Sequence, residues 1–305
     1  MRISSLYNTN AMLSQLNTNG SRISQLMEQM STQKRINVPS DDPVAASRLV
    51  QLNREQAAIN QYQSNISRVS NALSAQESHV QAVSDQLLAL NDKLLEAANG
   101  SHNAQDMAGY GTEFSSMLDS LVASLNAQNE NGSYLFAGTK TDTQPVQWDE
   151  QQSRYVYVGN DGSRTTDVAN GVSITENTTL ASALSDNGND LAMLNKLKAL
   201  SDKMQDPSIP PEDYQDDITD MLDRSSRVRD NIYSRLTELG GKQNRLTLLD
   251  DAHTDIALSN TQLAHDLADT DWATTSMNLQ LYVNSVQITN KAYSMISQLT
   301  LFSVM

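Results

Sequence analysis

The chain has 305 residues, of which 38% are hydrophobic and only 5% aromatic. This is too little apolar material for several thick globular cores, whereas long helices that each bury a narrow apolar stripe need less of it. The formal charge of −15 argues against a nucleic-acid backbone as a partner, because such binding needs a basic face, and the absence of cysteine excludes disulfides and thiolate sites.

The N-terminal segment is predicted to be an amphipathic helix with almost no charge. Its first 33 residues contain only three charged side chains, so it is poorly suited to solvent on its own. Apolar and small residues alternate at spacings of three and four, which predicts a coiled-coil face. The candidate assembly residues on this face are Leu6, Leu13, Leu16, Ile23, Met27 and Met30. The segment also lacks the pattern of a signal peptide, so we expect no cleaved leader.

An acidic pair follows in "RINVPSDDPVAAS", residues 35–47, where two prolines interrupt the helical pattern. The pair could be catalytic, could bind a metal, or could cap a helix at a bend. Asp42 is a suitable N-cap, and Pro43 suits the first helical position, where its missing N–H is not needed. A calcium loop needs more oxygen ligands than this stretch provides. We therefore assign Asp41, Asp42 and Pro43 to a helix cap and bend.

The proline-free tract from residue 44 to 144 predicts a long helix from about residue 43 to 98. Apolar side chains occupy seven successive heptad positions, which are Leu52, Ile59, Ile66, Leu73, Val80, Leu87 and Leu94. A companion line that includes Val69, Val83 and Leu90 completes an a/d seam. After a break at residues 99–103, Met107, Phe114, Leu118, Leu121 and Leu125 predict a second helix that folds back on the first.

A second proline-free tract, residues 212–305, repeats this pattern less regularly. Its apolar positions are Ile218, Met221, Val228, Ile232, Leu239, Leu246, Leu249, Ile256, Leu263 and Leu267, with gaps at Ser225, Arg235, Lys242, His253 and Asn260. Gly240 and Gly241 lie inside the pattern, where a kink is expected. Together the two tracts predict an antiparallel bundle of long helices.

Between the helical halves, the sequence pattern of residues from about 133 to 180 predicts a small β-rich insert. The stretches "YLFAG", "RYVYVG" and "GVSIT" alternate apolar and polar residues, and "GNDGS", residues 159–163, has the composition of a hairpin turn. A short helix is predicted from Leu191 to Met204. The order is therefore helix, β insert, helix.

The C-terminal segment mirrors the N-terminal one, because residues 273–305 contain a single charged side chain. Leu281, Ile288, Met295 and Phe302 form one stripe at spacing seven, with Ala292 and Leu299 beside it. Two charge-poor amphipathic helices at opposite ends of a chain are well suited to pair with each other and with further copies. We assign these six residues to the assembly interface.

No sequence pattern indicates chemistry. His79, His102, His253 and His265 are isolated, without metal-ligand spacing, and are interpreted as surface or seam residues. Asp266, Asp269 and Asp271 lack the multidentate loop that calcium needs. There is no glycine-rich phosphate loop and no nucleophile elbow. We expect no enzyme activity, no metal, no cofactor and no membrane span.

Several stretches resemble the flagellin superfamily, and within it most closely the hook-associated protein 3 family of hook–filament junction proteins. They are "MRISSLYNTN", "RINVPSDDPVAAS", "NGSYLFAGTKT" and "DLADTDWATTSMNLQ", with the ending "SQLTLFSVM". The resemblance implies a structural axial protein of the bacterial flagellum, outside the cell. It further implies export through the flagellar type III apparatus without a cleaved signal, aided by a chaperone that binds the C-terminal helix.

The expected fold is mainly α: an elongated bundle of long antiparallel helices with terminal coiled-coil helices and a small β-rich insert. We expect a terminal core domain from residues 1–42 with 268–305, a rod from 43–132 with 207–267, and an outward-facing insert at 133–206. The family's partners would be further copies in a ring, a neighbouring hook-associated protein on the hook side, and flagellin on the filament side. Filament flagellin itself, or an adhesin that carries its binding site on the insert, remain alternatives.

Overall fold

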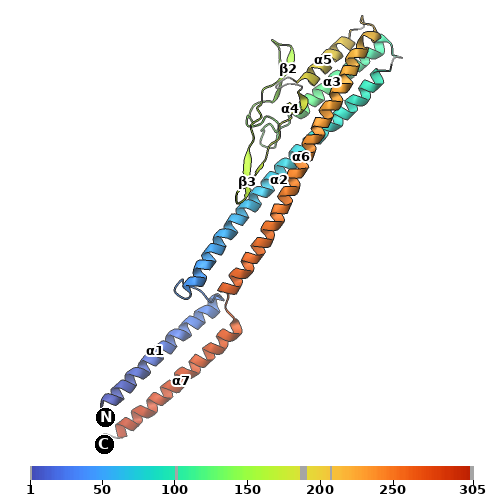
Figure 1. The fold of residues 1–305 in the computed structure, drawn as a ribbon. Helices are drawn as coiled ribbons and strands as arrows, with labels where there is room; N and C mark the ends of the chain where they lie inside the picture. Colours follow the sequence, from blue (N-terminus) through green and yellow to red (C-terminus); the bar gives the residue numbers. More distant parts are fainter. Residues whose placement is uncertain (1, 100–101, 186–190, 207, 303–305) are drawn as a thin grey trace. The chain divides into compact units, whose positions relative to one another are not determined.

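The computed structural model describes residues 2–99, 102–185, 191–206 and 208–302, except for the side chains of 2–6, 8 and 296–302. Its elements in order are α1 (Arg2–Thr32), α2 (Pro43–Ala97), α3 (Ala104–Leu125), β1 (Val146–Asp149), β2 (Arg154–Tyr157), β3 (Thr165–Ala169), β4 (Val172–Thr175), α4 (Ala181–Leu184), α5 (Ala192–Met204), η1 (Pro211–Tyr214), α6 (Gln215–Ala268) and α7 (Trp272–Phe302) (Figure 1). The mainly α fold with a small β insert is as predicted. The chain divides into two compact units, residues 1–59 with 254–305 and residues 60–253.

Helix α2 follows the heptad pattern of its sequence along its whole length of 55 residues. It begins at Pro43, and all seven predicted heptad residues from Leu52 to Leu94 are buried. The companion residues Val69, Val83 and Leu90 are fully enclosed as well. The predicted a/d seam is therefore confirmed, because one stripe of the helix carries nearly all of its buried surface.

Helix α6 also buries one heptad line, but its register differs from the predicted one towards the C-terminal end. The buried line is Ile218, Ser225, Ile232, Leu239, Leu246, His253 and Asn260. Ile256 and Leu263, which were predicted to lie in the seam, are exposed. The three polar residues of this line, Ser225, His253 and Asn260, were interpreted from the sequence as gaps in the apolar heptad pattern. The helix also continues through Gly240 and Gly241 as one element of 54 residues.

Two of the polar residues at buried seam positions in α6, His253 and Ser225, have hydrogen-bond partners there, whereas Asn260 Nδ2 is buried without one among the described residues. In the unit of residues 60–253, His253 Nε2 lies 2.8 Å from the Val168 carbonyl oxygen, and its ring stacks on Tyr62 at 5.5 Å between centroids. Ser225 Oγ accepts a hydrogen bond from Asn91 Nδ2 at 3.3 Å. A satisfied polar side chain can be buried at modest cost, so polarity alone does not mark a gap.

The unit of residues 60–253 is built on α2, α3, α5 and α6, whose apolar faces share one core. Helix α3 starts with a capping box, in which Asn103 and Asp106 each satisfy the other's backbone N–H. Gly111 allows α3 to approach α5 closely, since a Cβ there would lie only 2.9 Å from the Ser201 carbonyl oxygen. Ser201 Oγ donates to the Gly111 carbonyl at 2.8 Å, which fixes the two helices together. The predicted helix α5 is confirmed.

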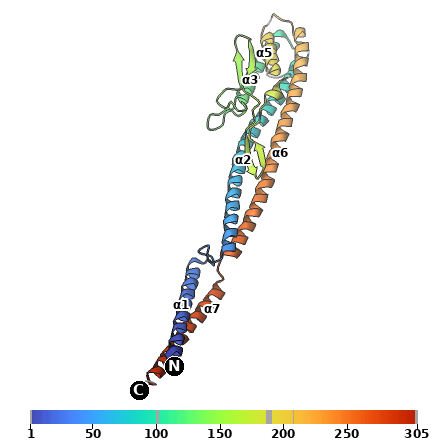
Figure 2. The same cartoon turned by 60° about the vertical axis from the view of Figure 1, so that its left-hand side comes forward.

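The β insert consists of two separate two-stranded antiparallel hairpins, β1–β2 and β3–β4 (Figure 2). Val146 pairs with Tyr157 in the first hairpin, and Thr165 pairs with Thr175 in the second. The prediction of a hairpin turn at residues 159–163 was wrong, because this stretch connects the hairpins. "YLFAG" also forms no strand, apart from one bridge between Gln128 and Tyr134. Its glycine is required by a turn, since Gly138 has φ +72°.

Side chains from the helices hold both outer edges of the β1–β2 hairpin. Asn126, at the end of α3, donates to the Val146 carbonyl and accepts from the Val146 N–H, both at 2.9 Å. Asn195 of α5 does the same for Tyr155, at 3.0 and 2.6 Å. Each asparagine thus supplies the donor and acceptor that a neighbouring strand would supply, and protects an otherwise open edge.

Buried residues of the insert belong to the same core as the long helices. Phe136, Val168, Ile174 and Leu194 are nearly or fully enclosed in it. Tyr157 Oη donates to the Phe136 carbonyl at 2.9 Å, and burial, with a smaller contribution from Asp161, raises the pKa of Tyr157 to about 12. The hydroxyl therefore stays neutral and serves as a structural donor. The insert is an integral part of this unit.

Adjacent leucines of α2 provide a matched test of this packing. Leu87 is fully buried and Leu88 is 46% exposed. We expect Leu87→Ala to lower the free energy of unfolding by about 2–5 kcal/mol, because it leaves a cavity. Leu88→Ala should change it by less than about 0.5 kcal/mol. Urea denaturation followed by circular dichroism measures both, and similar losses for the two variants would contradict the described register.

Candidate assembly interface

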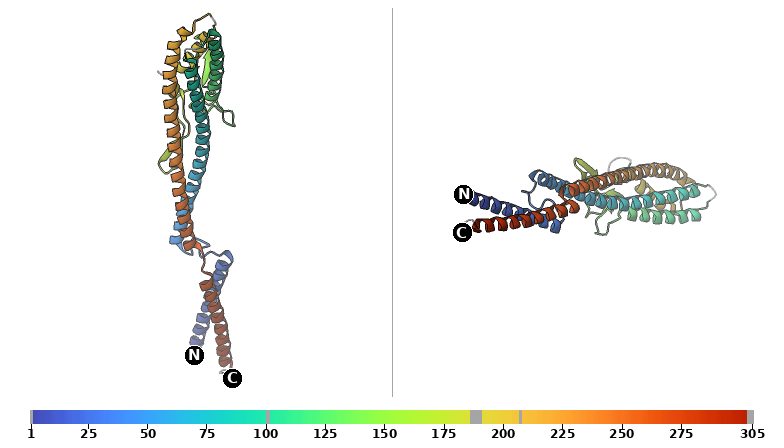
Figure 3. Two further views of the ribbon diagram at one scale, coloured as in Figure 1. Left: turned by 90° about the vertical axis from the view of Figure 1, so that its right-hand side faces the viewer. Right: turned by 90° about the horizontal axis from the view of Figure 1, so that it is seen from below.

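Helices α1 and α7 lie side by side in the unit of residues 1–59 and 254–305 (Figure 3). The line of α1 that is buried or half-buried consists of Thr9, Met12, Leu16, Asn19, Ile23, Leu26 and Met30. The matching line of α7 consists of Thr275, Asn278, Tyr282, Ser285, Thr289 and Ala292. Both lines alternate spacings of three and four, which is the signature of a coiled-coil seam.

The seam between α1 and α7 has an unusual polar content. Asn19 is only 2% exposed, and its Nδ2 donates to Ser285 Oγ of α7 at 3.1 Å. Gln15 Nε2 donates in turn to Asn19 Oδ1 at 3.4 Å. A single buried polar contact of this kind lowers the stability of a coiled coil but fixes its register, because a shifted pairing would leave the amide unsatisfied. Asn19 therefore aligns α1 with α7.

A second stripe on each helix lies beside the seam and is exposed. On α7, Leu281 is 59% exposed, Ile288 is 68% exposed and Met295 is 52% exposed. On α1, Leu13 and Met27 are about half exposed and lie on either side of Gly20, which has open space around it. On α7 the exposed apolar residues at spacing seven form one stripe, whereas on α1 Leu13 and Met27 are fourteen residues apart, with Gly20 between them. Such a surface is expected where another molecule binds.

The structure thus divides the predicted assembly residues into two groups. Leu16, Ile23, Met30 and Ala292 are half-buried and lie on the lines that α1 and α7 turn towards each other. The second group is exposed, and we call it the outer stripe; it consists of Leu13 and Met27 on α1 and Leu281, Ile288 and Met295 on α7. The side chains of Leu6, Leu299 and Phe302 lie outside the described residues. Sequence analysis merged the two lines on α1 because both have apolar residues at spacing seven, and it overlooked Asn19 because that residue is polar.

The connections between the helices in this unit run antiparallel, with a bridge between Lys34 and Asp269, and are hydrogen-bonded to each other. The Arg35 N–H donates to the Ala268 carbonyl at 2.7 Å, and the Thr270 N–H donates to the Gln33 carbonyl at 3.0 Å. Gln33 adopts a left-handed conformation with φ 58° at the end of α1. The Arg35 guanidinium bonds the Leu267 carbonyl at 2.9 Å and Asp42 at 3.1 Å. One arginine therefore ties the segment after α1 to the end of α6 and to the start of α2.

The acidic pair of this connection makes capping contacts. Asp42 Oδ1 accepts from the Ala45 N–H at 3.0 Å at the start of α2, where Pro43 is the first helical residue. Asp41 Oδ2 accepts from the Asn37 and Val38 N–H groups at 3.0 and 3.1 Å. The backbone hydrogen bond from Ala45, helped by Arg35, lowers the pKa of Asp42, and the bond from Val38 lowers that of Asp41. Both carboxylates stabilise turns in their charged form.

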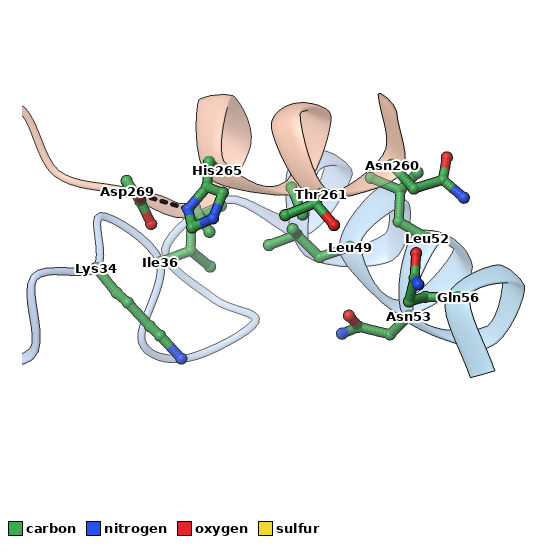
Figure 4. Close-up of a pocket in the computed structure, with 12 residues that line it drawn as sticks. Lys34, Ile36, Leu49, Leu52, Asn53, Gln56, Asn260, Thr261, His265 and Asp269 are labelled. Atoms are coloured by element: carbon green, nitrogen blue, oxygen red, sulfur yellow. Dashed lines mark hydrogen bonds and ion pairs between the residues drawn. The ribbon is translucent and has the colours of Figure 1, made fainter. Parts of the chain in front are cut away.

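A cavity of about 360 Å³ lies between the first turns of α2 and the last turns of α6 in the same unit (Figure 4). Leu49 and Leu52 line it from α2, and Asn260 and Thr261 line it from α6. His265 and Asp269 form a hydrogen bond of 2.8 Å at its edge.

Within the described residues no three His, Asp or Glu side chains are grouped as a metal site would need. No described helix combines the length and the apolar character needed to cross a membrane.

The fold and this surface define a helical structural protein of the flagellin type. Residues 3–141 match the model of the bacterial flagellin N-terminal helical region. Flagellar hook-associated protein 3 of Escherichia coli strain K12 is 30% identical over 297 residues, which covers 91% of each chain. The protein of the same name from Salmonella typhimurium is 26% identical over 295 residues, or 92% of each chain. The chain belongs to the flagellar hook-associated protein 3 family.

Solved structures agree with this assignment. A structure from Vibrio parahaemolyticus, assigned to a flagellar hook-associated protein, is 38% identical with a TM-score of 0.68 and covers 75% of this chain and 100% of its own. The flagellar junction protein FlgL of Legionella pneumophila is 15% identical, with a TM-score of 0.62 and coverage of 73% and 100%. The second likeness concerns the fold alone. The chain is therefore a flagellar component, and its relatives are named as hook-associated proteins rather than enzymes.

The capping carboxylates predict how the start of α2 responds to pH. Because the folded-state pKa of Asp42 is lowered, its stabilising contribution is present above the ordinary carboxyl pKa and is lost as pH falls through the lowered value. Hydrogen exchange of the backbone amides of residues 44–47, corrected for intrinsic rates, should therefore accelerate on acidification. In Asp42→Asn the cap stays neutral, so this dependence should vanish, while Glu55→Gln should retain it. Equal acid sensitivity in Asp42→Asn would exclude Asp42 as the titrating group.

Proposed function

We propose that this protein forms the junction that joins the flagellar hook to the flagellin filament through self-assembly of its terminal helices. The outer stripe is the observation that supports the proposal: apolar residues on α7 and α1 are exposed on helices with almost no charge. Relatives named flagellar hook-associated protein 3 support a place next to the hook.

The physical basis of the proposed assembly is burial of the outer stripe between copies. Each of Leu281, Ile288 and Met295 would contribute roughly 1.5–3 kcal/mol on full burial. The lack of charge near the stripe means that no ion pairs could replace this term. The proposed partners are further copies in a ring, a neighbouring hook-associated protein on the hook side and flagellin on the filament side. An export chaperone that binds α7 would shield the same stripe before assembly.

The domain arrangement follows from this proposal. Residues 1–42 and 268–305 would form the inner core of the axial structure, residues 43–132 and 207–267 the layer around it, and residues 133–206 the outward face. The protein would be extracellular on the flagellum and exported without a cleaved signal peptide. Filament flagellin is the alternative within the same superfamily, and copy number separates the two, because a junction needs about one ring per organelle.

Removal of the protein tests the proposal directly. Cells that lack it should carry hooks without filaments in negative-stain electron micrographs and should release flagellin into the medium. Re-expression of the intact chain should restore filaments. Cells that lack the protein but keep normal filaments would overturn the junction role, and cells that lose the hooks as well would indicate a function earlier in assembly.

Charge placed in the outer stripe should separate assembly from folding. We expect Ile288→Asp combined with Met295→Asp to leave the thermal unfolding transition of residues 60–253 nearly unchanged, since neither residue belongs to that core. A carboxylate forced into an apolar seam costs several kcal/mol, roughly 2–7 for an uncompensated polar group and more when charged. Cells with this variant should shed filaments.

The matched control is Gln287→Glu with Asn290→Asp, which adds the same charge at exposed polar positions of α7. These cells should retain filaments. Secretion of both variants must be measured by immunoblot, because the chaperone would use the same helix. A doubly substituted stripe variant that is secreted and still holds filaments on hooks would exclude the outer stripe as the assembly surface.

A further inference from the structure

Two helix faces in the unit of residues 1–59 and 254–305 expose apolar side chains beside unpaired charges. On α2, Val50 is 50% exposed and is followed one turn later by the exposed Arg54. On α6, Leu258 is 70% exposed and is preceded one turn earlier by the exposed Asp255. Within the described part of the chain, neither Arg54 nor Asp255 has an ion-pair partner. Both faces are therefore open for contact.

The two faces point in opposite directions. A helix turns about 100° per residue, so Arg54 lies on the side of α2 opposite the buried Ala45, nine residues earlier. Leu258 lies about 160° around α6 from the buried Asn260. The buried sides of both helices face one cavity, which Leu52 and Asn260 line (Figure 4). One copy therefore cannot bring its own two exposed faces together.

The charges of the two faces are complementary. The α2 face carries Arg54, about 40° around the helix from Val50, whereas Arg48 lies about 160° from Val50 on the other side of α2. Between residues 254 and 268, α6 carries two aspartates and no lysine or arginine. Complementary charge beside an apolar contact selects one pairing and register over others, because like faces would repel. The α2 face matches the α6 face of another copy better than it matches a second α2 face.

We propose that the α2 face of one copy packs against the α6 face of the next copy, with Val50 against Leu258 and Arg54 paired with Asp255. Such a contact is heterologous, so its repetition generates a ring or a helical array instead of a closed dimer. The inference rests on the proposed function, because it requires copies to stand side by side. It adds to the outer stripe a second contact surface, carried by the long helices.

Cysteine cross-linking tests the pairing, since the natural chain has no cysteine. Intact flagella from cells that express Val50→Cys with Leu258→Cys should give a ladder of dimers, trimers and larger species on oxidation, which a reductant collapses. Each single variant can give dimers at most. Val50→Cys with Ile256→Cys is the matched control, because Ile256 is also exposed but lies on another side of α6. The pairing would be overturned if cells kept their filaments but the Val50→Cys, Leu258→Cys variant gave no more cross-linked species than the control.

Charge reversal provides an independent readout. Arg54→Asp and Asp255→Arg should each release filaments at a lower shear force than the unmodified protein, and the double reversal should restore retention. The proposed ion pair would be overturned if neither single reversal lowered the shear force that releases filaments. It would also be overturned if the double reversal retained filaments no better than the weaker of the two single variants. Either result leaves the junction role intact, because that role fails only if cells without the protein keep their filaments. Circular dichroism of the purified variants confirms that the helices are retained.

Discussion

The antiparallel hydrogen bonding between the two helix connections is the constraint on which the terminal unit depends. Arg35 bonds the carbonyl end of α6 through its backbone and its guanidinium, and the same guanidinium holds Asp42 at the start of α2. The segments on both sides of the terminal helices are thereby fixed to one another. Helices α1 and α7 can then pair in one register, which Asn19 selects through Ser285. If the register of α1 against α7 were not fixed, the outer-stripe residues of the two helices would have no defined positions relative to each other.

Polar and apolar residues are divided between the two sides of the terminal helix pair in a way that suits assembly. The inner seam contains Asn19, Asn278 and Ser285, which specify alignment at some cost in stability. The outer stripe contains Leu281, Ile288 and Met295, whose burial would be favourable only in contact with another molecule. A polar seam next to an exposed apolar stripe favours association with another molecule over a tightly closed helix pair. This is the behaviour that the proposed junction would require of its subunits.

The unit of residues 60–253 differs from the terminal unit, because it buries apolar residues in a core of its own. Its core joins the long helices with the insert, and Asn126 and Asn195 cover the outer edges of the first hairpin. Covered edges matter wherever many copies stand close together, since open strands would pair between neighbours. At Val146 and Tyr155 the first hairpin therefore offers no unpaired edge to another strand. The faces of α2 and α6 near Val50 and Leu258 remain available for ordered lateral contact.

The sequence by itself determined the mainly α fold, the limits of the long helices, the heptad line from Leu52 to Leu94 and the low charge of both ends, because these follow from local periodicity and composition. Only the tertiary structure decided which of two heptad lines on α1 turns inward, since Leu13 and Leu16 are equally apolar. It also decided that His253 and Asn260 lie in the seam while Ile256 and Leu263 are exposed. A polar side chain becomes acceptable in a seam when a distant carbonyl such as that of Val168 receives its hydrogen bond, and that partner is brought near only by the folded chain.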